Sequence, residues 1–207
     1  MRTMADPLAE SVIDLDAWLP APEIVTRHRR DAATGPDALW AAARSVRLDQ
    51  TRTIGRLVRW RIPGVPADQS FMGLLAEDPF TVLDEGAQHS ISGLCGRIWT
   101  FSRDYAELSG PDDFMAWSAP RTVRVLFAHW VTPGPDGRGS TLHSEARVSP
   151  TDGLATVRLR ALWLAVGPFE RLIGAEGSRR AGTSATALMR ELGEARERLR
   201  MADAGAA

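Results

Sequence analysis

The 207-residue sequence contains no lysine and no asparagine, and it has one cysteine and one tyrosine. All 25 basic residues counted as lysine plus arginine are therefore arginine, a bias that indicates a GC-rich genome rather than a function. Schiff-base and lysine general-base mechanisms are excluded, as is a P-loop, because each needs a lysine. The single Cys95 excludes an internal disulfide and fits a reducing compartment.

The chain also lacks a strong net charge and a long apolar run. A formal net charge of -1 gives no overall field that would attract nucleic acid or anionic lipid. The longest apolar run, Ala161–Phe169, is too short to span a bilayer, and the N-terminus carries acids where a secretory signal would be apolar. We therefore expect a soluble, cytoplasmic protein with no membrane span and no nucleic-acid partner.

Hydrophobic periodicity predicts a mainly β domain closed by one long helix. Strands are expected at Glu23–Ala33, Phe80–Glu85, Gln88–Trp99, Asp113–Ala119, Thr122–Thr132 and Ser140–Val148, and helices at Asp37–Val46, Leu154–Ile173 and Ser184–Arg200. Short helical turns are expected within Ser11–Leu19 and Ser70–Ala76, and a less clear helix within residues 47–66. The long helix should be kinked at Pro168 and cover a cavity with the stripe Leu154, Val157, Ala161, Leu164, Ala165, Pro168 and Leu172.

The length fits one domain. We divide the chain into a loose leader at 1–22, a folded domain at 23–182, and a C-terminal helix and tail at 183–207.

Several segments resemble a known superfamily. They are ATGPDALW at Ala33–Trp40, GLCGRIW at Gly93–Trp99, LHSEARV at Leu142–Val148, and Leu162–Trp163 followed by Pro168. These segments, in this order, resemble the START-like superfamily, also called SRPBCC or polyketide cyclase/dehydratase-like. The resemblance implies an α+β helix-grip fold, in which a curved antiparallel sheet wraps a long helix around an internal cavity. Ser144, Ala146 and Leu162 depart from the family pattern, which has two threonines and a tyrosine there.

Strand alternation sorts side chains onto two faces. Val125, Phe127, His129 and Val131 share the more apolar face of their strand, so we expect His129 to point inward, and His28 likewise in the first strand. In the last strand Leu142, Ser144, Ala146 and Val148 should point inward, and His143, Glu145 and Arg147 outward to solvent. Each inward histidine is either an acid–base or ligand-binding group or a hydrogen-bonded core residue.

Arg97 and Trp99 are expected on one strand face with His89, Ile91 and Cys95. Arg97 either grips a ligand carboxylate or phenolate or pairs with Glu85 or Glu145. Trp99 and Trp163 are placed near the cavity, and Phe127 and Phe169 complete the predicted ligand-binding set with His28, Arg97 and His129. No metal site is expected, because the histidines lie on scattered strands and Cys95 stands alone.

The leading hypothesis is a protein that binds a hydrophobic or aromatic small molecule of lipid or polyketide type, without a cofactor. The alternative is a cyclase- or dehydratase-like enzyme that uses His28 or His129 as acid or base; no catalytic residue is assigned. A third hypothesis is an interaction module that uses Ser184–Arg200, and pairing of two copies as a homodimer stays open.

Overall fold

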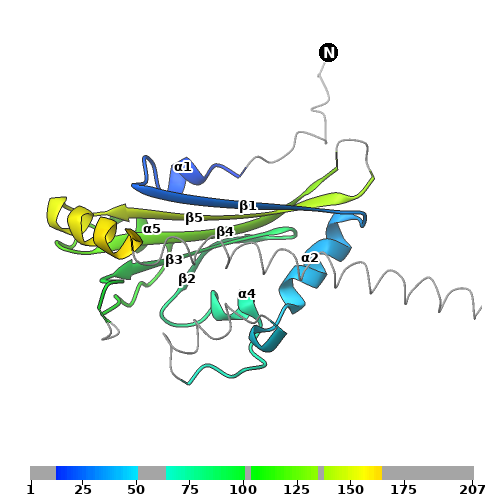
Figure 1. Cartoon of the computed structure of the whole chain (residues 1–207), viewed down its shortest axis with the longest axis horizontal. Helices are drawn as coiled ribbons and strands as arrows, with labels where there is room; N and C mark the ends of the chain where they lie inside the picture. Colours follow the sequence, from blue (N-terminus) through cyan, green and yellow to red (C-terminus); the bar gives the residue numbers. More distant parts are fainter. Residues whose placement is uncertain (1–12, 51–63, 101–103, 135–137, 165–207) are drawn as a thin grey trace, which may run out of the picture.

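Five antiparallel strands form one sheet at the centre of the molecule (Figure 1). The computed structural model describes residues 13–50, 64–100, 104–134 and 138–164. The strands are β1 (Ile24–Ala32), β2 (Thr81–Gly86), β3 (His89–Gly96), β4 (Val123–Pro133) and β5 (Ser140–Pro150). Their order is β1-β5-β4-β3-β2, so β1 and β2 are the two edges of an open sheet. The predicted α+β class with an antiparallel sheet is confirmed.

The register of the three strands β1, β5 and β4 is continuous. β4 pairs with β5 from Val123 opposite Pro150 to Pro133 opposite Ser140. β1 then pairs with the other edge of β5, from Ile24 opposite Val148 to Ala32 opposite Ser140. Gly139 precedes β5 with φ of 76° and lies against the Ala32 carbonyl, where a side chain would be strained and crowded.

Helices lie on both sides of the sheet (Figure 1). α2 (Pro36–Ser45) and α4 (Phe71–Leu74) lie on one side and α1 (Leu15–Trp18) on the other. The 3-10 turn η1 (Leu48–Gln50) follows α2. α2 begins at a proline, whose fixed φ suits a first helical position. Its Leu39 and Trp40 pack against Val131 and Leu142 of the sheet, as the predicted helix requires.

The central strands β3, β4 and β5 carry buried residues on both faces of the sheet. We call the face that carries Val125, Phe127, His129 and Val131 the α2 face, and the face that carries Leu126, Ala128 and Trp130 the α1 face. On the α1 face, β3 and β4 pack under Leu15 and Leu19 of the α1 segment and under Phe114. The predicted parity of β4 is confirmed by this packing, but the expectation that the opposite face meets solvent is wrong.

The segment at 113–119 is not the predicted strand. Residues Pro111–Ala116 form helix α5, with a proline at its first turn and two acidic residues, Asp112 and Asp113, near its N-terminus. Proline and acids are favoured there because the first N–H groups have no helical partner and carry partial positive charge. Phe114 is fully buried on the α1 face, where its ring lies over Gly93 of β3.

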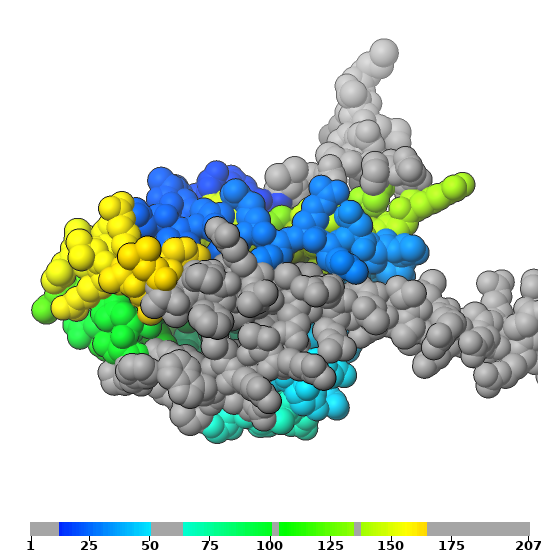
Figure 2. Space-filling view, in the orientation of Figure 1, coloured from blue at the N-terminus to red at the C-terminus, as the bar shows by residue number. Residues whose placement is uncertain are grey.

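The long helix is described only in its first part, where residues 153–164 are helical. Asp152 caps it by accepting a 2.7 Å hydrogen bond from the Ala155 N–H at Oδ1. Ala155 and Leu159 are fully buried, and burial of a leucine side chain contributes about 1.5–3 kcal/mol. The predicted inward stripe is wrong here, because its Val157 and Leu164 are 65% and 85% exposed. This helix forms one end of the face seen in Figure 2.

Several expectations lie outside the described residues. These are the helix beyond residue 164 with its Pro168 kink, most of the helix within residues 47–66, and the Ser184–Arg200 helix. The described part of the expected loose leader contains α1, whose Leu15 is buried on the sheet, so residues 13–19 are packed rather than loose. The short helical turns predicted around α1 and α4 are confirmed.

Candidate functional site

A row of polar side chains crosses the α2 face of the sheet. Ser144 of β5 pairs with His28 of β1 on one side and with His129 of β4 on the other. Ser90 of β3 continues the row opposite His129. We call His28, Ser144, His129 and Ser90 the polar row. Because neighbouring strands lie ~4.8 Å apart, the Cα atoms of the two histidines are separated by about 10 Å, with Ser144 between them.

The polar row lies between two apolar clusters on the same face. Toward one end, Val131 and Leu142 pack against α2. Toward the other end, Val125 and Val148 pack against Leu159 of the 153–164 helix. The sheet between these clusters thus carries hydroxyl and imidazole groups where both neighbouring areas are apolar.

The side chains beside the polar row are mostly small. In the next register step, Thr26 lies opposite Ala146, Ala146 opposite Phe127, and Phe127 opposite Ser92. Ala146 and Thr26 stay partly accessible, as do Ser144 and His28 in the polar row. The two strands β1 and β5 thus carry small or polar, partly accessible side chains on this face between the two apolar clusters.

His129 is the most buried histidine of the site. It is 7% exposed, and its ring meets Phe71 of α4 edge-on, with ring centroids 5.8 Å apart. Burial lowers the pKa of His129 from its usual 6.5 to about 4, because the charged imidazolium would lose its hydration. The ring is therefore neutral near pH 7 and offers one N–H donor and one nitrogen acceptor.

Several buried polar atoms in the row and in the clusters beside it have no hydrogen-bond partner among the described residues. They include Nε2 of His28, Nε2 of His129 and Oγ1 of Thr26, all on the α2 face. The indole Nε1 atoms of Trp40 and Trp99 are also buried and unpartnered. Leaving such a group unsatisfied costs about 1–3 kcal/mol. A bound molecule that supplies partners would recover part of that free energy.

Of the predicted aromatic residues, Phe127 lies one register step from the row, and Trp99 lies in the apolar cluster beyond it. Phe127 is half-buried and meets Phe80 edge-on at 5.8 Å between ring centroids. Trp99 packs against the cluster of Val125 and lies 5.9 Å from the Arg158 guanidinium. β3 ends at Gly96, so Trp99 is not on the strand face expected for it. Phe169 is outside the described residues.

Arg97 does not pair with either of the acidic residues predicted as its partners. It follows the end of β3, and its Nη1 lies 3.0 Å from the Asp104 carboxylate. The expected pairing with Glu85 or Glu145 is therefore wrong. Gly96 causes this change of direction, because it adopts φ of 148° and approaches the backbone of Asp104 and Tyr105. Arg97 Nε remains buried without a partner.

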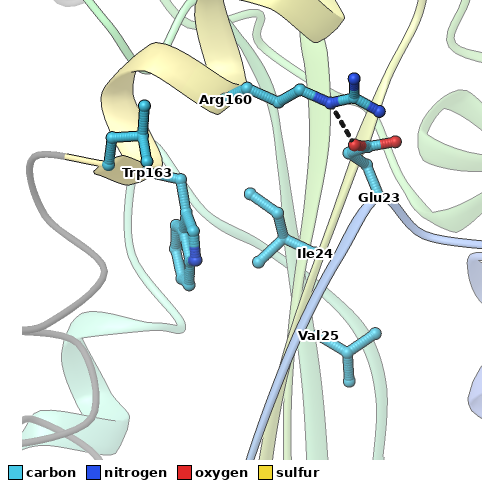
Figure 3. Close-up of a pocket in the computed structure, with 6 residues that line it drawn as sticks. Glu23, Ile24, Val25, Arg160 and Trp163 are labelled. Atoms are coloured by element: carbon cyan, nitrogen blue, oxygen red, sulfur yellow. Dashed lines mark hydrogen bonds and ion pairs between the residues drawn. The ribbon is translucent and has the colours of Figure 1, made fainter.

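Trp163 lines a separate open pocket of about 510 Å³ at edge strand β1 (Figure 3). Its indole lies beside Ile24, and Arg160 reaches across to Glu23, with Nε 2.7 Å from the carboxylate. The pocket includes Val25 and Leu164 as exposed apolar residues. The structure thus groups Trp163 with the rim of β1 rather than with the polar row.

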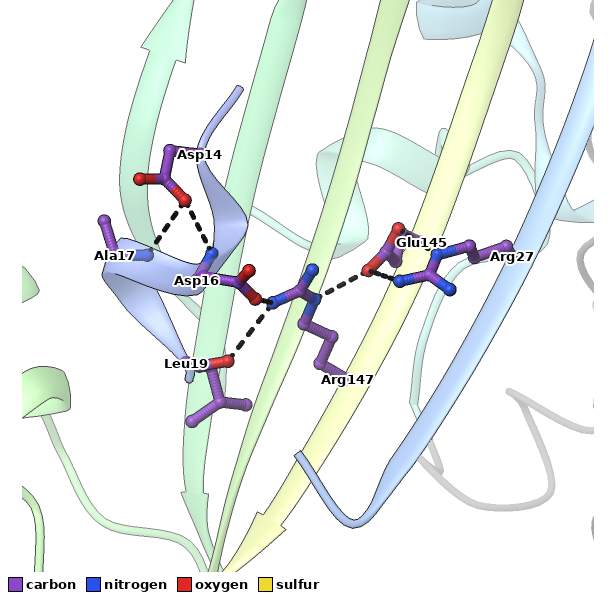
Figure 4. Close-up of polar contacts among 7 residues, drawn as sticks. All are labelled: Asp14, Asp16, Ala17, Leu19, Arg27, Glu145 and Arg147. Carbon is purple, nitrogen blue, oxygen red and sulfur yellow. Dashed lines mark hydrogen bonds and ion pairs between the residues drawn. The ribbon is translucent and has the colours of Figure 1, made fainter. Parts of the chain in front are cut away.

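The α1 face holds a charged network that the sequence did not reveal (Figure 4). Arg147 donates from Nε to Glu145 at 2.6 Å and from Nη1 to Asp16 of α1 at 2.5 Å. Arg27 donates from Nε to the other oxygen of Glu145 at 2.8 Å. Glu145 and Arg147 were expected in solvent, yet they are only 6% and 7% exposed because the α1 segment covers them. The predicted face of Glu145 and Arg147 was right, but their predicted exposure to solvent was wrong.

Three other kinds of feature bear on function within the described part of the chain: a metal site, a reactive cysteine and a membrane-spanning helix. Within it, no three His, Cys, Asp or Glu side chains come together as metal ligands. Cys95 is fully buried on the α1 face, and burial raises its pKa to about 12. None of the helices within these residue ranges is both long and apolar enough to cross a membrane.

Comparison with known proteins gives no family. No family model matches the chain, and no curated protein matches it. Among solved structures, TTHA0849 from Thermus thermophilus is similar at 11% identity over 80% of this chain and 99% of that one, with a TM-score of 0.32. DR_A0006 from Deinococcus radiodurans has 11% identity over 72% and 98%, with a TM-score of 0.25. Mll3558 from Rhizobium loti has 17% identity over 72% and 94%, with a TM-score of 0.21. Scores this low carry no argument about function.

Proposed function

We propose that the protein binds a small, largely apolar molecule on the α2 face, with the polar row as the anchor for its polar group. The observation that carries this proposal is the pair of buried, unpartnered histidine Nε2 atoms in His28 and His129, on either side of Ser144. Ligand sites commonly combine apolar walls with a few convergent polar groups. The two apolar clusters supply the walls here, and the histidines supply the polar groups.

The sequence resemblance supports the same proposal. The motifs similar to START-like proteins include LHSEARV, which lies in β5, and ATGPDALW, which supplies Trp40. A helix-grip protein holds its ligand between sheet and helix, and α2 and the 153–164 helix both pack on the face that carries the row. Within this proposal, the 153–164 helix bounds one end of the site through the buried Leu159.

Binding is favoured over acid–base catalysis by the state of His129. An efficient general acid or base has a pKa near the working pH, and burial moves the pKa of His129 to about 4. A neutral imidazole is suited instead to fix the orientation of a ligand by hydrogen bonding. The cyclase- or dehydratase-like alternative would therefore need His28 as its acid or base.

Native mass spectrometry of freshly purified protein tests the proposal. We expect an added mass that is released on denaturation, and a fluorescence increase when N-phenyl-1-naphthylamine enters the apolar site. Ser144→Phe should weaken probe binding about tenfold or more, since the larger side chain would occupy the position of the bound molecule beside the polar row. Ser118→Phe is the matched control, because Ser118 is exposed after α5.

The proposal is refuted if the wild type carries no added mass and also fails to bind the probe. It is likewise refuted if Ser144→Phe, shown to be folded by circular dichroism, binds the probe as the control does.

A further inference from the structure

We propose that the ligand of the α2 face is uncharged and carries hydrogen-bond acceptors, such as carbonyl or ether oxygens, on an apolar frame. This inference rests on the proposed function and specifies the chemical class that the same site selects. It follows from two properties of the site, which are the kind of polar atom left unpartnered and the charges around the row.

The first property is an excess of hydrogen-bond donors. Trp40 lies in the cluster on one side of the polar row, and Trp99 packs against the cluster on the other side. Their buried Nε1 atoms have no acceptor, and an indole nitrogen can only donate. Nε2 of His28, Nε2 of His129 and Oγ1 of Thr26 can donate or accept. Among the described residues, no carbonyl or carboxylate oxygen of a side chain is buried and unpartnered.

A ligand that satisfies these atoms must therefore supply acceptors. Carbonyl and ether oxygens accept hydrogen bonds and can be carried on an apolar frame that fits between the two clusters. A plain hydrocarbon would fill the same space and leave the donors unsatisfied, at the cost of their lost hydration.

The second property is the charge around the row, which disfavours an anion. Within the described strands, the charged residue in register with the row is Glu85, exposed on edge strand β2 opposite Ser90. Arg30 lies one register step away but is exposed on edge strand β1. Arg97 lies beyond the end of β3, outside the row, and its Nη1 is paired with Asp104, although its Nε has no partner among the described residues. A carboxylate placed at Ser144 would lose its hydration without gaining a buried cation, which is unfavourable.

Three naphthalenes of matched size provide the test. 2-Acetonaphthone is neutral and has a carbonyl acceptor, 2-naphthoate is anionic, and 2-isopropylnaphthalene has neither charge nor acceptor. Isothermal titration of the full chain should rank the ketone tightest. We expect an advantage of about tenfold over the hydrocarbon, the scale of one hydrogen bond to a buried donor, and a larger one over the carboxylate.

Substitutions in the polar row test whether it causes the preference for the ketone over the hydrocarbon. His129→Phe should remove most of the preference for the ketone over the hydrocarbon while both still bind. His89→Phe is the matched control, since His89 lies on the α1 face of β3, and it should retain the wild-type preference. If His129→Phe does not fold, His28→Phe tests the other end of the row in the same way.

The outcomes separate this inference from the proposed function. Equal or tighter binding of 2-naphthoate overturns the claim of an uncharged ligand and leaves small-molecule binding intact. Equal binding of 2-isopropylnaphthalene overturns the requirement for an acceptor. If the wild type binds none of the three compounds and also fails to bind N-phenyl-1-naphthylamine, the proposed function itself fails. Binding of the apolar probe together with rejection of 2-acetonaphthone overturns only the ligand class.

Discussion

Burial of His129 should make the protein less stable in mildly acidic solution. The folded-state pKa is about 4, and the usual value of 6.5 applies to the unfolded chain. Between these values the unfolded chain binds a proton that the folded protein does not. The free energy of unfolding therefore falls as the pH decreases from about 6.5 to about 4, and this contribution is fully retained above 6.5.

The size of the effect follows from the two pKa values. Integrated between about pH 7 and pH 5, the linkage relation gives a loss of about 2 kcal/mol from this histidine, and about 3 kcal/mol when the pH reaches 4 or below. For a protein of this length, a loss of 2 kcal/mol lowers the melting temperature by roughly 4–8 °C.

Urea unfolding followed by circular dichroism at the two pH values measures this loss. His129→Phe should lose about 2 kcal/mol less than the wild type between pH 7 and pH 5, because phenylalanine cannot take up a proton. The comparison uses the difference between pH values, so any packing change that acts equally at both pH values cancels. His89→Phe should keep the part of the pH dependence of the unfolding free energy that arises from His129. The reasoning is refuted if His129→Phe retains the wild-type pH dependence.

Two further substitutions test the α1 face. Arg147→Met should cost about 3 kcal/mol, since it leaves buried Glu145 with Arg27 alone, whereas Arg160→Met should cost about 1 kcal/mol or less because its pair is exposed. Equal losses in urea unfolding would contradict the burial argument. Cys95→Ser should destabilise modestly and leave ligand binding unchanged, and native Cys95 should resist iodoacetamide at pH 7 until urea unfolds the chain, because its raised pKa keeps the thiol protonated.

The sequence predicted the faces of the central strands well. In β4 the charged Arg124 marks the face opposite Val125, Phe127 and Val131, although Leu126, Ala128 and Trp130 on that opposite face are apolar as well. The parity of His28 and His129 could therefore be predicted. Their shared neighbour Ser144 could not, since it requires the strand order β1-β5-β4 as well as the parity of each strand.

The strand predicted at 113–119 was wrong because the apolar pattern of this short segment also fits a helix. Residues 113–119 contain apolar and aromatic side chains that suggested a short strand. The start signals Gly110 and Pro111 and the three-residue spacing of Phe114 and Trp117 favour a helix instead. For a run this short, periodicity alone does not separate the two structures.

The burial of Glu145 and Arg147 could not be predicted from alternation either. Alternation assigns a side chain to a face, but it does not say what covers that face. The cover here is α1, whose Asp16 lies 131 residues before Arg147. Such non-local contacts leave no periodic signal in the strand itself.

Several buried polar side chains are hydrogen-bonded on one face of the sheet, whereas two histidine nitrogens on the other lack partners in the described ranges. This contrast is the main reason to propose that the site lies on the α2 face. On the α1 face, Arg147 and Glu145 bind each other, and the Trp117 indole N–H donates to Thr122 at 2.9 Å. On the α2 face, the buried Nε2 atoms of His28 and His129 have no partner within the part of the chain that the structure describes. The named polar groups of the α1 face are therefore hydrogen-bonded, whereas these two histidine nitrogens of the α2 face are not. Unpartnered buried groups are costly, so the position of these two nitrogens between two apolar clusters is the observation on which the proposed ligand rests.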